Sequence, residues 1–368
     1  MRKEYISYKP KRDVLFVFGA GASIADGGPF QSQLLPRILA TDFSGHELAE
    51  QTVVFIRENF DTTSGKEPSL ESVFGYLEYF ISKKESLKEG YNTLRLIQIK
   101  ESLIRLIHHE ISKSTKSKGV YKSFFEKVSK VNKNVSIITM NYDTLLDESF
   151  DFLYSSEALI DYCINFMNYD EDIQTGGADW WINPREPVTI HGDTVPSPIK
   201  IIKIHGSINW KYCNCCNQVL LTPWNTGIDL ESQGFKGRFG PSCENPEEEI
   251  FDLVCHNDKT PFDTFIVPPS HIKGLNHPAI SKLFDEAAIE IRKTKKIVFV
   301  GFSFPEADVH IKALFKKNIK EDTTIEVVDP FMNDAIRSNY LSLSQKVSFI
   351  PDSFENYIEN NLAKVLTS

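Results

Sequence analysis

The sequence predicts an α/β fold: a doubly wound, Rossmann-like parallel sheet with a helical insertion and a small irregular module that holds cysteines. Three observations predict this fold. Short apolar runs rich in β-forming residues recur along the chain, segments with helical periodicity separate them, and small or polar residues follow most of the runs. Strands that alternate with helices build a parallel sheet, and the carboxyl ends of such strands share the edge that binds ligands.

The first half of the chain contains two predicted strands with a long helical stretch between them. Residues 13–18 are the first strand, because this apolar run lies between a charged segment and glycine. Residues 31–130 predict a helical insertion, since leucine and isoleucine recur at helical spacing within 96–107. Residues 135–140 form the second strand and lead directly into Asn141.

The second half begins with a third predicted strand at 199–204, which ends at His205. Residues 210–262 have little periodicity and hold most of the cysteines, so we expect a small irregular module there. Regular alternation then returns, with predicted helices at 279–292, 308–320, 332–343 and 354–365 and predicted strands at 297–300, 325–328 and 347–350. We therefore expect one domain over residues 1–368 that contains the insertion and the module.

Composition limits the classes of function. The 368 residues carry a formal net charge of −9, with 41% hydrophobic and 25% charged residues, which are ordinary globular values. The acidic balance argues against direct nucleic-acid binding, which usually needs a basic face. No apolar run reaches the roughly 18 residues that span a bilayer, and the first residues are too polar for a secretory signal. We expect a soluble, cytoplasmic protein that binds no membrane.

Two motifs follow the first two strands. Residues 19–23 (GAGAS) are small, so the backbone can approach a pyrophosphate closely; the alternative is a tight strand–helix turn. Asn141 and Asp143 follow the second strand. An asparagine amide can hold a ribose hydroxyl or a water, and a carboxylate can fix that amide or bind a sugar hydroxyl. The alternative for this segment is an Asx turn.

A histidine follows the third strand. His205 precedes a glycine at the strand end and is placed as a general base; the alternative is a structural histidine. His191 also precedes a glycine, but the residues around it predict a loop. Further along, Gly301 and Ser303 suit a phosphate, and Asp308 lies just beyond them. Asp329 follows the next strand, where a carboxylate suits the adenine-side ribose.

In this order, the segments GAGAS, TMNYD, KIHGSINW, GFSFPEAD and VVDP resemble the sirtuin superfamily, and more closely its bacterial sirtuin-like NAD hydrolase branch. The resemblance covers residues 14–330 apart from the helical insertion. It implies that Asn141 and His205 are catalytic, beside the ribose that carries nicotinamide. It also implies contacts to NAD⁺ from Gly19, Ala20, Gly21, Ser23, Asp143, Gly301, Ser303, Asp308 and Asp329.

The activity implied is hydrolysis of NAD⁺ to nicotinamide and ADP-ribose, in anti-phage defence by NAD depletion. The resemblance also implies a regulatory partner, such as a HerA-type ATPase or a short Argonaute, or control by homo-oligomerisation. A protein deacylase is the alternative enzyme, but residues 27–32 (GGPFQS) lack the arginine and aspartate of the corresponding deacylase segment. A nucleotide sensor without turnover is the alternative outside enzymes. It would not need both Asn141 and His205.

The cysteines predict a structural zinc site within the module. Cys213 and Cys216 have the C-x₂-C spacing of zinc ligands, at the position where deacylating sirtuins carry a zinc ribbon. Tetrahedral zinc needs four ligands, and Cys243 and Cys255 are the candidates to complete the set. Cys215 and His256 compete for these positions. The alternative is a group of buried, reduced thiols.

Overall fold

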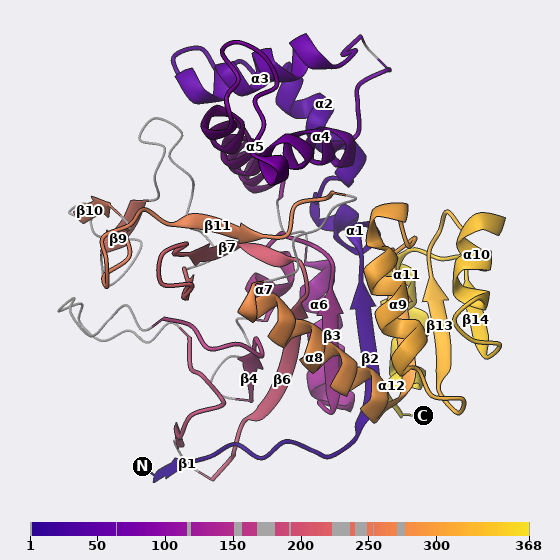
Figure 1. Ribbon diagram of the computed structural model, residues 1–368. Coiled ribbons are helices and arrows are strands. Elements are labelled where there is room, and N and C mark those ends of the chain that lie inside the picture. Colours follow the sequence, from indigo (N-terminus) through magenta and orange to yellow (C-terminus); the bar gives the residue numbers. More distant parts are fainter. Residues whose placement is uncertain are drawn as a thin grey trace.

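A seven-stranded parallel sheet forms the centre of the computed structural model (Figure 1). The structure describes residues 2–63, 65–115, 119–150, 157–167, 181–190, 193–222, 236–239, 249–252, 254–270 and 277–367. The strand order is β14-β13-β12-β2-β3-β6-β4, and every neighbouring pair is parallel. The strands are β2 (Arg12–Phe18), β3 (Val135–Thr139), β4 (Ala158–Asp161), β6 (Ser197–Lys203), β12 (Thr294–Val300), β13 (Thr324–Val328) and β14 (Val347–Ile350).

The chain winds through this sheet in two directions. From β2 it moves to β3 and on to β4 and β6, and it then returns to the other side of β2 to form β12, β13 and β14. The order therefore reverses beside β2, which confirms the predicted doubly wound architecture. Residues 14–18 of β2 and all of β3 are buried, as expected of strands that are covered on both faces.

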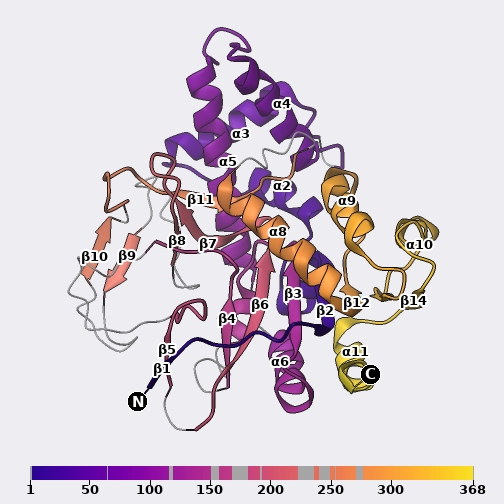
Figure 2. The ribbon, with the colours of Figure 1, turned by 60° about the horizontal axis from the view of Figure 1, so that its bottom comes forward.

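Helices cover both faces of the sheet (Figures 1 and 2). One face carries α8 (Pro278–Lys293) and α9 (Val309–Asn318), which pack on each other. The other carries α6 (Val120–Val131), α11 (Phe354–Asn360) and α12 (Leu362–Thr367). Two smaller helices complete the layers: α7 (Leu145–Ser149) packs on α6, and α10 (Asp334–Leu341) packs on β14. Among the helices described, none has the length and apolar character to cross a bilayer.

The helical insertion has its own core above the carboxyl edge of the sheet, at the top of Figure 1. Its helices are α2 (Gln31–Ala40), α3 (Glu47–Asn59), α4 (Leu70–Lys83) and α5 (Thr93–Ser114). We predicted that α6 belongs to this unit, within residues 31–130. Instead Tyr121, Phe124, Phe125 and Val128 of α6 lie in the core of the sheet, because the apolar face of α6 packs against that layer. The packed unit of four helices thus ends at Ser114.

The predicted irregular module, 210–262, contains more regular structure than its sequence suggests. A three-stranded antiparallel sheet is formed by β7 (Gly206–Tyr212), β8 (Val219–Leu221) and β11 (Asp263–Ile266). Within the module, β9 (Lys236–Phe239) also pairs with β10 (Glu249–Asp252). A separate pair outside it joins β1 (Arg2–Glu4) to β5 (Val188–Ile190). Trp210 of β7 is fully buried in the core of the large sheet, so the boundary with the main domain is not sharp.

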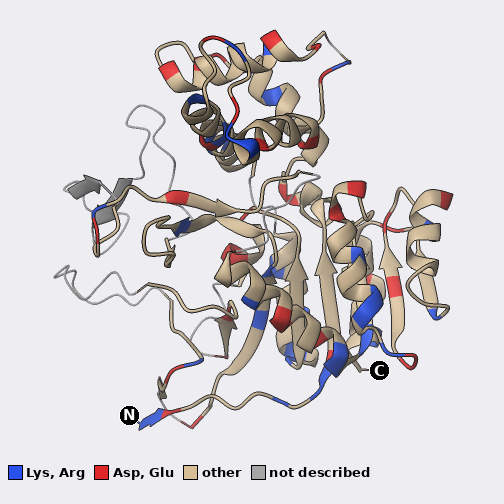
Figure 3. Ribbon diagram, viewed as in Figure 1, with Lys and Arg blue, Asp and Glu red and all other residues tan. Residues whose placement is uncertain are grey.

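A buried network of ion pairs fixes α8 to the sheet. Arg12 Nε lies 2.8 Å from Glu290, and Lys200 Nζ lies 2.7 Å from Glu286 and 2.9 Å from Glu290. Arg185 adds a contact of 3.1 Å to Glu286. Figure 3 shows acidic positions on α8 next to basic positions on β6. Because buried charges need partners, this network aligns β2, β6 and α8.

Candidate active site

The carboxyl ends of the strands line a cavity of about 900 Å³. Its walls come from the residues that follow β2, β3, β6, β12 and β13, and α2 with the start of α4 forms the opposite wall. The predicted site residues that line this cavity are Ala20, Gly21, Asn141, His205, Gly301, Ser303, Asp308 and Asp329. The other three, Gly19, Ser23 and Asp143, lie within two positions of these in the sequence but do not line the cavity.

Glycines bring the loops after β2 and β12 into backbone contact. The Gly21 amide donates to the Gly301 carbonyl over 3.0 Å. A Cβ at Gly19 would lie 2.4 Å from the Gly301 oxygen, and Gly301 itself has a φ of +61°. Larger residues would therefore separate the two loops. The close packing places Ala20 of helix α1 (Ala20–Ser23) beside the second loop at the cavity wall.

Asn141 links this loop pair to the end of β3. Its Nδ2 donates to the Gly19 carbonyl over 3.0 Å and to the Ser23 hydroxyl over 2.9 Å. A carbonyl oxygen only accepts, so the amide orientation is fixed, and Oδ1 is left to accept from a molecule in the cavity. Ser23 is buried and also contacts the Tyr121 hydroxyl, 3.0 Å away. Ser23 thus lies behind Asn141, whereas the resemblance implied a pyrophosphate contact.

Asp143 lies in the buried segment behind the cavity. Burial raises the pKa of its carboxyl above the ordinary value, and the nearby Lys203 ammonium offsets part of that increase. Lys203 Nζ donates to the Asp143 carbonyl oxygen over 2.7 Å and to the Asp147 carboxylate over 2.6 Å. Lys203 and Asp147 are completely buried. This pair ties the end of β6 to the segment after β3, and so sets the spacing between Asn141 and His205.

His205 faces the cavity from the end of β6. It is only 4% exposed, and its Nε2 lies 3.2 Å from Nε2 of His310 and 3.7 Å from Oδ1 of Asp308. Gly206 allows the turn, because it has a φ of +79° and a Cβ there would lie 2.1 Å from the Phe265 oxygen. The sequence reasoning missed His310. Its signal was the Asp-x-His spacing, which places both side chains at the start of α9.

The cavity is acidic. The carboxylates among its lining residues are Glu67, Glu71, Asp308, Asp329 and Glu355, and no lysine or arginine occurs among the lining residues that the structure describes. Glu67 and Glu71 come from the helical insertion and were not predicted. Asp329 uses one oxygen to accept from the Phe331 amide over 2.8 Å. The cavity therefore suits a ligand with positive charge, and an anionic part of that ligand must rely on backbone amides and neutral side-chain donors such as Ser303.

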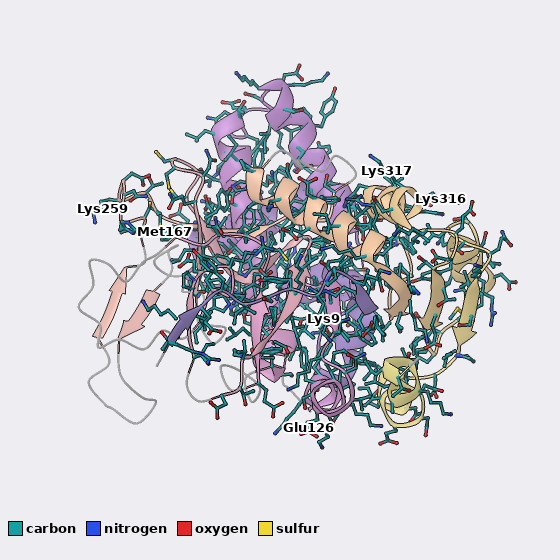
Figure 4. All side chains as sticks on the ribbon, turned by 90° about the horizontal axis from the view of Figure 1, so that it is seen from below. Lys9, Glu126, Met167, Lys259, Lys316 and Lys317 are labelled. Carbon is teal, nitrogen blue, oxygen red and sulfur yellow. The ribbon has the colours of Figure 1, made fainter. Side chains whose placement is uncertain are left out.

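The predicted zinc ligands come together in part. Cys213, Cys216, Cys255 and Asp258 place their ligand atoms within 4.8 Å of one another. The sulfurs of Cys216 and Cys255 are 3.8 Å apart, and two sulfurs at about 2.3 Å from tetrahedral zinc are also about 3.8 Å apart. Asp258 takes the fourth place, while Cys243 lies outside the described residues. Figure 4 shows Met167, which packs against this cluster, on the same flank as Lys259.

We expect the purified protein to retain about one equivalent of zinc at this cluster, because structural sites with four ligands bind tightly. Elemental analysis after dialysis against a weak chelator measures it. Cys216→Ser should lose the metal, and Cys215→Ser is the matched control, since Cys215 is exposed and is not one of the four ligands, although its side chain hydrogen-bonds to Asp258. Metal-free wild-type protein, or equal loss in both variants, would contradict this assignment.

Solved structures that resemble this one include Sir2 enzymes. A mutant Sir2 homologue in complex with ADP-ribose is 12% identical; the match covers 97% of this chain and 92% of that chain, with a TM-score of 0.45. Sir2 with the inhibitor EX-527, 2′-O-acetyl-ADP-ribose and a deacetylated p53 peptide is 11% identical. That match covers 97% of this chain and 96% of that chain, with a TM-score of 0.39. No family model and no curated protein matches the chain. Likenesses this distant carry no argument about function.

Proposed function

We propose that the chain hydrolyses NAD⁺ to nicotinamide and ADP-ribose in this cavity. The observation that carries the proposal is the position of Asn141 and His205, which line one cavity together with the two glycine loops. The ordered motifs that resemble the sirtuin-like NAD hydrolases support the same substrate. In this arrangement the pyrophosphate lies against the backbone of residues 20–21 and 301–303, and the ribose that carries nicotinamide lies between Asn141 and His205.

Two side chains carry the chemistry. Cleavage of the bond between nicotinamide and ribose resembles glycoside cleavage, because positive charge develops on the ribose ring. Nicotinamide leaves as a neutral molecule, so the reaction needs no general acid. The free Oδ1 of Asn141 accepts a hydrogen bond from the attacking water or a ribose hydroxyl. His205 takes the proton that the attacking water loses. The carboxylates of the cavity stabilise the positive charge that develops on the ribose ring.

We expect discrimination against NADP⁺. Asp329 lines the cavity beyond the β13 strand end, where it would meet the adenine-side ribose, and a carboxylate there binds a 2′-hydroxyl but repels a 2′-phosphate. Asp329→Asn should therefore raise the relative kcat/KM for NADP⁺ by about tenfold or more, since one like-charge contact costs several kcal/mol. Rates for both dinucleotides measure it. Glu355→Gln is a matched control elsewhere in the cavity, and an unchanged ratio in Asp329→Asn would contradict this placement.

The experiment that tests the proposal is nicotinamide release from NAD⁺ with and without an acetyl-lysine peptide. We expect equal amounts of nicotinamide and ADP-ribose, and no increase on adding the peptide. Release that requires the peptide would favour the deacylase. Binding of NAD⁺ without release, in the presence of the activating partner, would favour a sensor.

The same resemblance leads us to propose a role in bacterial anti-phage defence, by NAD⁺ depletion and abortive infection. An uncontrolled NAD⁺ hydrolase would kill its own host, so the activity needs a trigger. A HerA-type ATPase, a short Argonaute or assembly of copies of this chain would supply it. Cellular NAD⁺ should fall after infection in cells with this chain and its partner, and it should not fall with His205→Ala. Unchanged NAD⁺ in the wild type would contradict the defence role.

A further inference from the structure

Three ligand atoms converge where His205 faces the start of α9. Nε2 of His205, a carboxylate oxygen of Asp308 and a ring nitrogen of His310 all lie within 4.8 Å of one another. His205 and Asp308 are buried but line the cavity, and His310 is half-buried. The cavity gives a small ion direct access to this group.

The spacing fits a tetrahedral metal ion. Two imidazole nitrogens at about 2.05 Å from zinc are about 3.3 Å apart, and the two Nε2 atoms here are 3.2 Å apart. The Asp308 carboxylate oxygen lies 3.7 Å from Nε2 of His205. A small rotation of the Asp308 side chain would bring this oxygen to the distance that two ligands of one zinc ion require. Two histidines and one carboxylate are a common set of protein ligands for zinc, with the fourth position open. Here that position faces the cavity.

We propose that Zn²⁺ binds to His205, Asp308 and His310 and switches off the reaction in the cavity. The inhibition rests on the proposed NAD⁺ hydrolysis, whereas the binding does not. A metal bound to Nε2 occupies the lone pair with which His205 takes a proton, so the histidine can no longer act as a base. The ion also occupies the space beside the nicotinamide ribose. The carboxylates of the cavity attract the divalent cation and raise its local concentration.

The described part of the chain thus offers two metal sites of different chemistry. The cluster of Cys213, Cys216, Cys255 and Asp258 offers three thiolates in a closed arrangement, as a structural site requires. The group of His205, Asp308 and His310 offers no thiolate and three ligands only, so it should bind more weakly and exchange its ion. A protein that keeps zinc at the first site can therefore respond to free zinc at the second.

Cobalt spectroscopy of the full chain tests the binding without relying on turnover. Co²⁺ at the cysteine cluster gives an intense sulfur-to-metal charge-transfer band, and Co²⁺ at the histidine group gives visible d–d bands without it. In Cys216→Ser we expect a titration with only the second type of spectrum. Adding His310→Ala should weaken that titration by more than about tenfold, since even outer partners of a ligand contribute 10- to 100-fold to affinity. Adding His109→Ala, on the helical insertion, should leave it unchanged.

The inhibition has its own measurement. Micromolar Zn²⁺ should stop nicotinamide release by the wild type, and a chelator should restore it. If Cys216→Ser binds no cobalt, or if its binding survives His310→Ala, the proposed site is wrong whether or not NAD⁺ is hydrolysed. If cobalt binds as expected and zinc leaves turnover unchanged, the switch is wrong. A chain that binds cobalt but releases no nicotinamide would contradict the NAD⁺ hydrolase and leave the metal site standing.

Discussion

His205→Ala is expected to lower the rate of nicotinamide release from NAD⁺ by about 10²–10⁴-fold, the usual contribution of a positioned base. The affinity for NAD⁺ should stay within a few-fold of the wild type, because proton transfer stabilises the transition state more than the bound substrate. Asn141→Ala should also reduce turnover, with some loss of affinity, since its Oδ1 would contact the ribose directly. Product formation and NAD⁺ titration on each variant separate the two effects.

His109→Ala is the matched control for His205→Ala. His109 is half-buried on α5, where its ring packs against Phe43, and it does not line the cavity. We expect normal turnover from this variant. His191, the other histidine that precedes a glycine, lies outside the described residues. Full activity in His205→Ala together with loss of activity in His191→Ala would show that the wrong histidine was assigned.

Lys203→Met is expected to lower the free energy of unfolding by about 3–5 kcal/mol, the usual effect of removing one partner of a buried ion pair. The substitution leaves the Asp147 carboxylate buried without its ammonium and removes the hydrogen bond to the Asp143 carbonyl. Both residues of the pair are fully buried, so water cannot replace the lost partner. Chemical denaturation, with circular dichroism as the signal, measures the change.

The double variant Lys203→Met with Asp147→Asn tests the cause. It removes the buried charge along with its partner, so it should recover part of the stability lost in Lys203→Met. The Tyr162 hydroxyl, 2.6 Å from Asp147, can still donate to the amide oxygen. If the double variant loses as much free energy of unfolding as the two single variants together, Lys203 does not stabilise the fold through this ion pair.

The sequence was sufficient to predict six of the seven strands of the sheet and most of the cavity wall, whereas the edge strand β4 was not predicted. Each parallel strand is a short apolar run, and each run ends where the chain must leave the buried layer, so Asn141, His205, Gly301 and Asp329 were placed at one edge by simple rules. Their shared cavity follows from the strand order. The roles of these residues toward NAD⁺ remain predictions.

Other features depended on packing that the sequence does not reveal. The periodicity of α6 resembles that of the helices before it, and only its contacts assign it to the sheet core. His310 lies 105 residues from His205 along the chain, and local patterns carry no information at that range. Asp258 completes the cysteine cluster. It was missed because the sequence spacings typical of zinc sites involve mainly cysteine and histidine. The acidic face of the insertion, with Glu67 and Glu71, likewise reaches the cavity only through folding.

Product analysis in water labelled with ¹⁸O tests the central claim most directly. If the cavity hydrolyses NAD⁺, the ADP-ribose formed by the wild type with its activating partner should carry one labelled oxygen on the former nicotinamide ribose. Unlabelled ADP-ribose incubated under the same conditions corrects for exchange at that position. Mass spectrometry should find the label in step with nicotinamide release, and His205→Ala should give neither. Release of nicotinamide with the ADP-ribose group transferred to a peptide or an acetyl group, and no labelled ADP-ribose, would contradict the account.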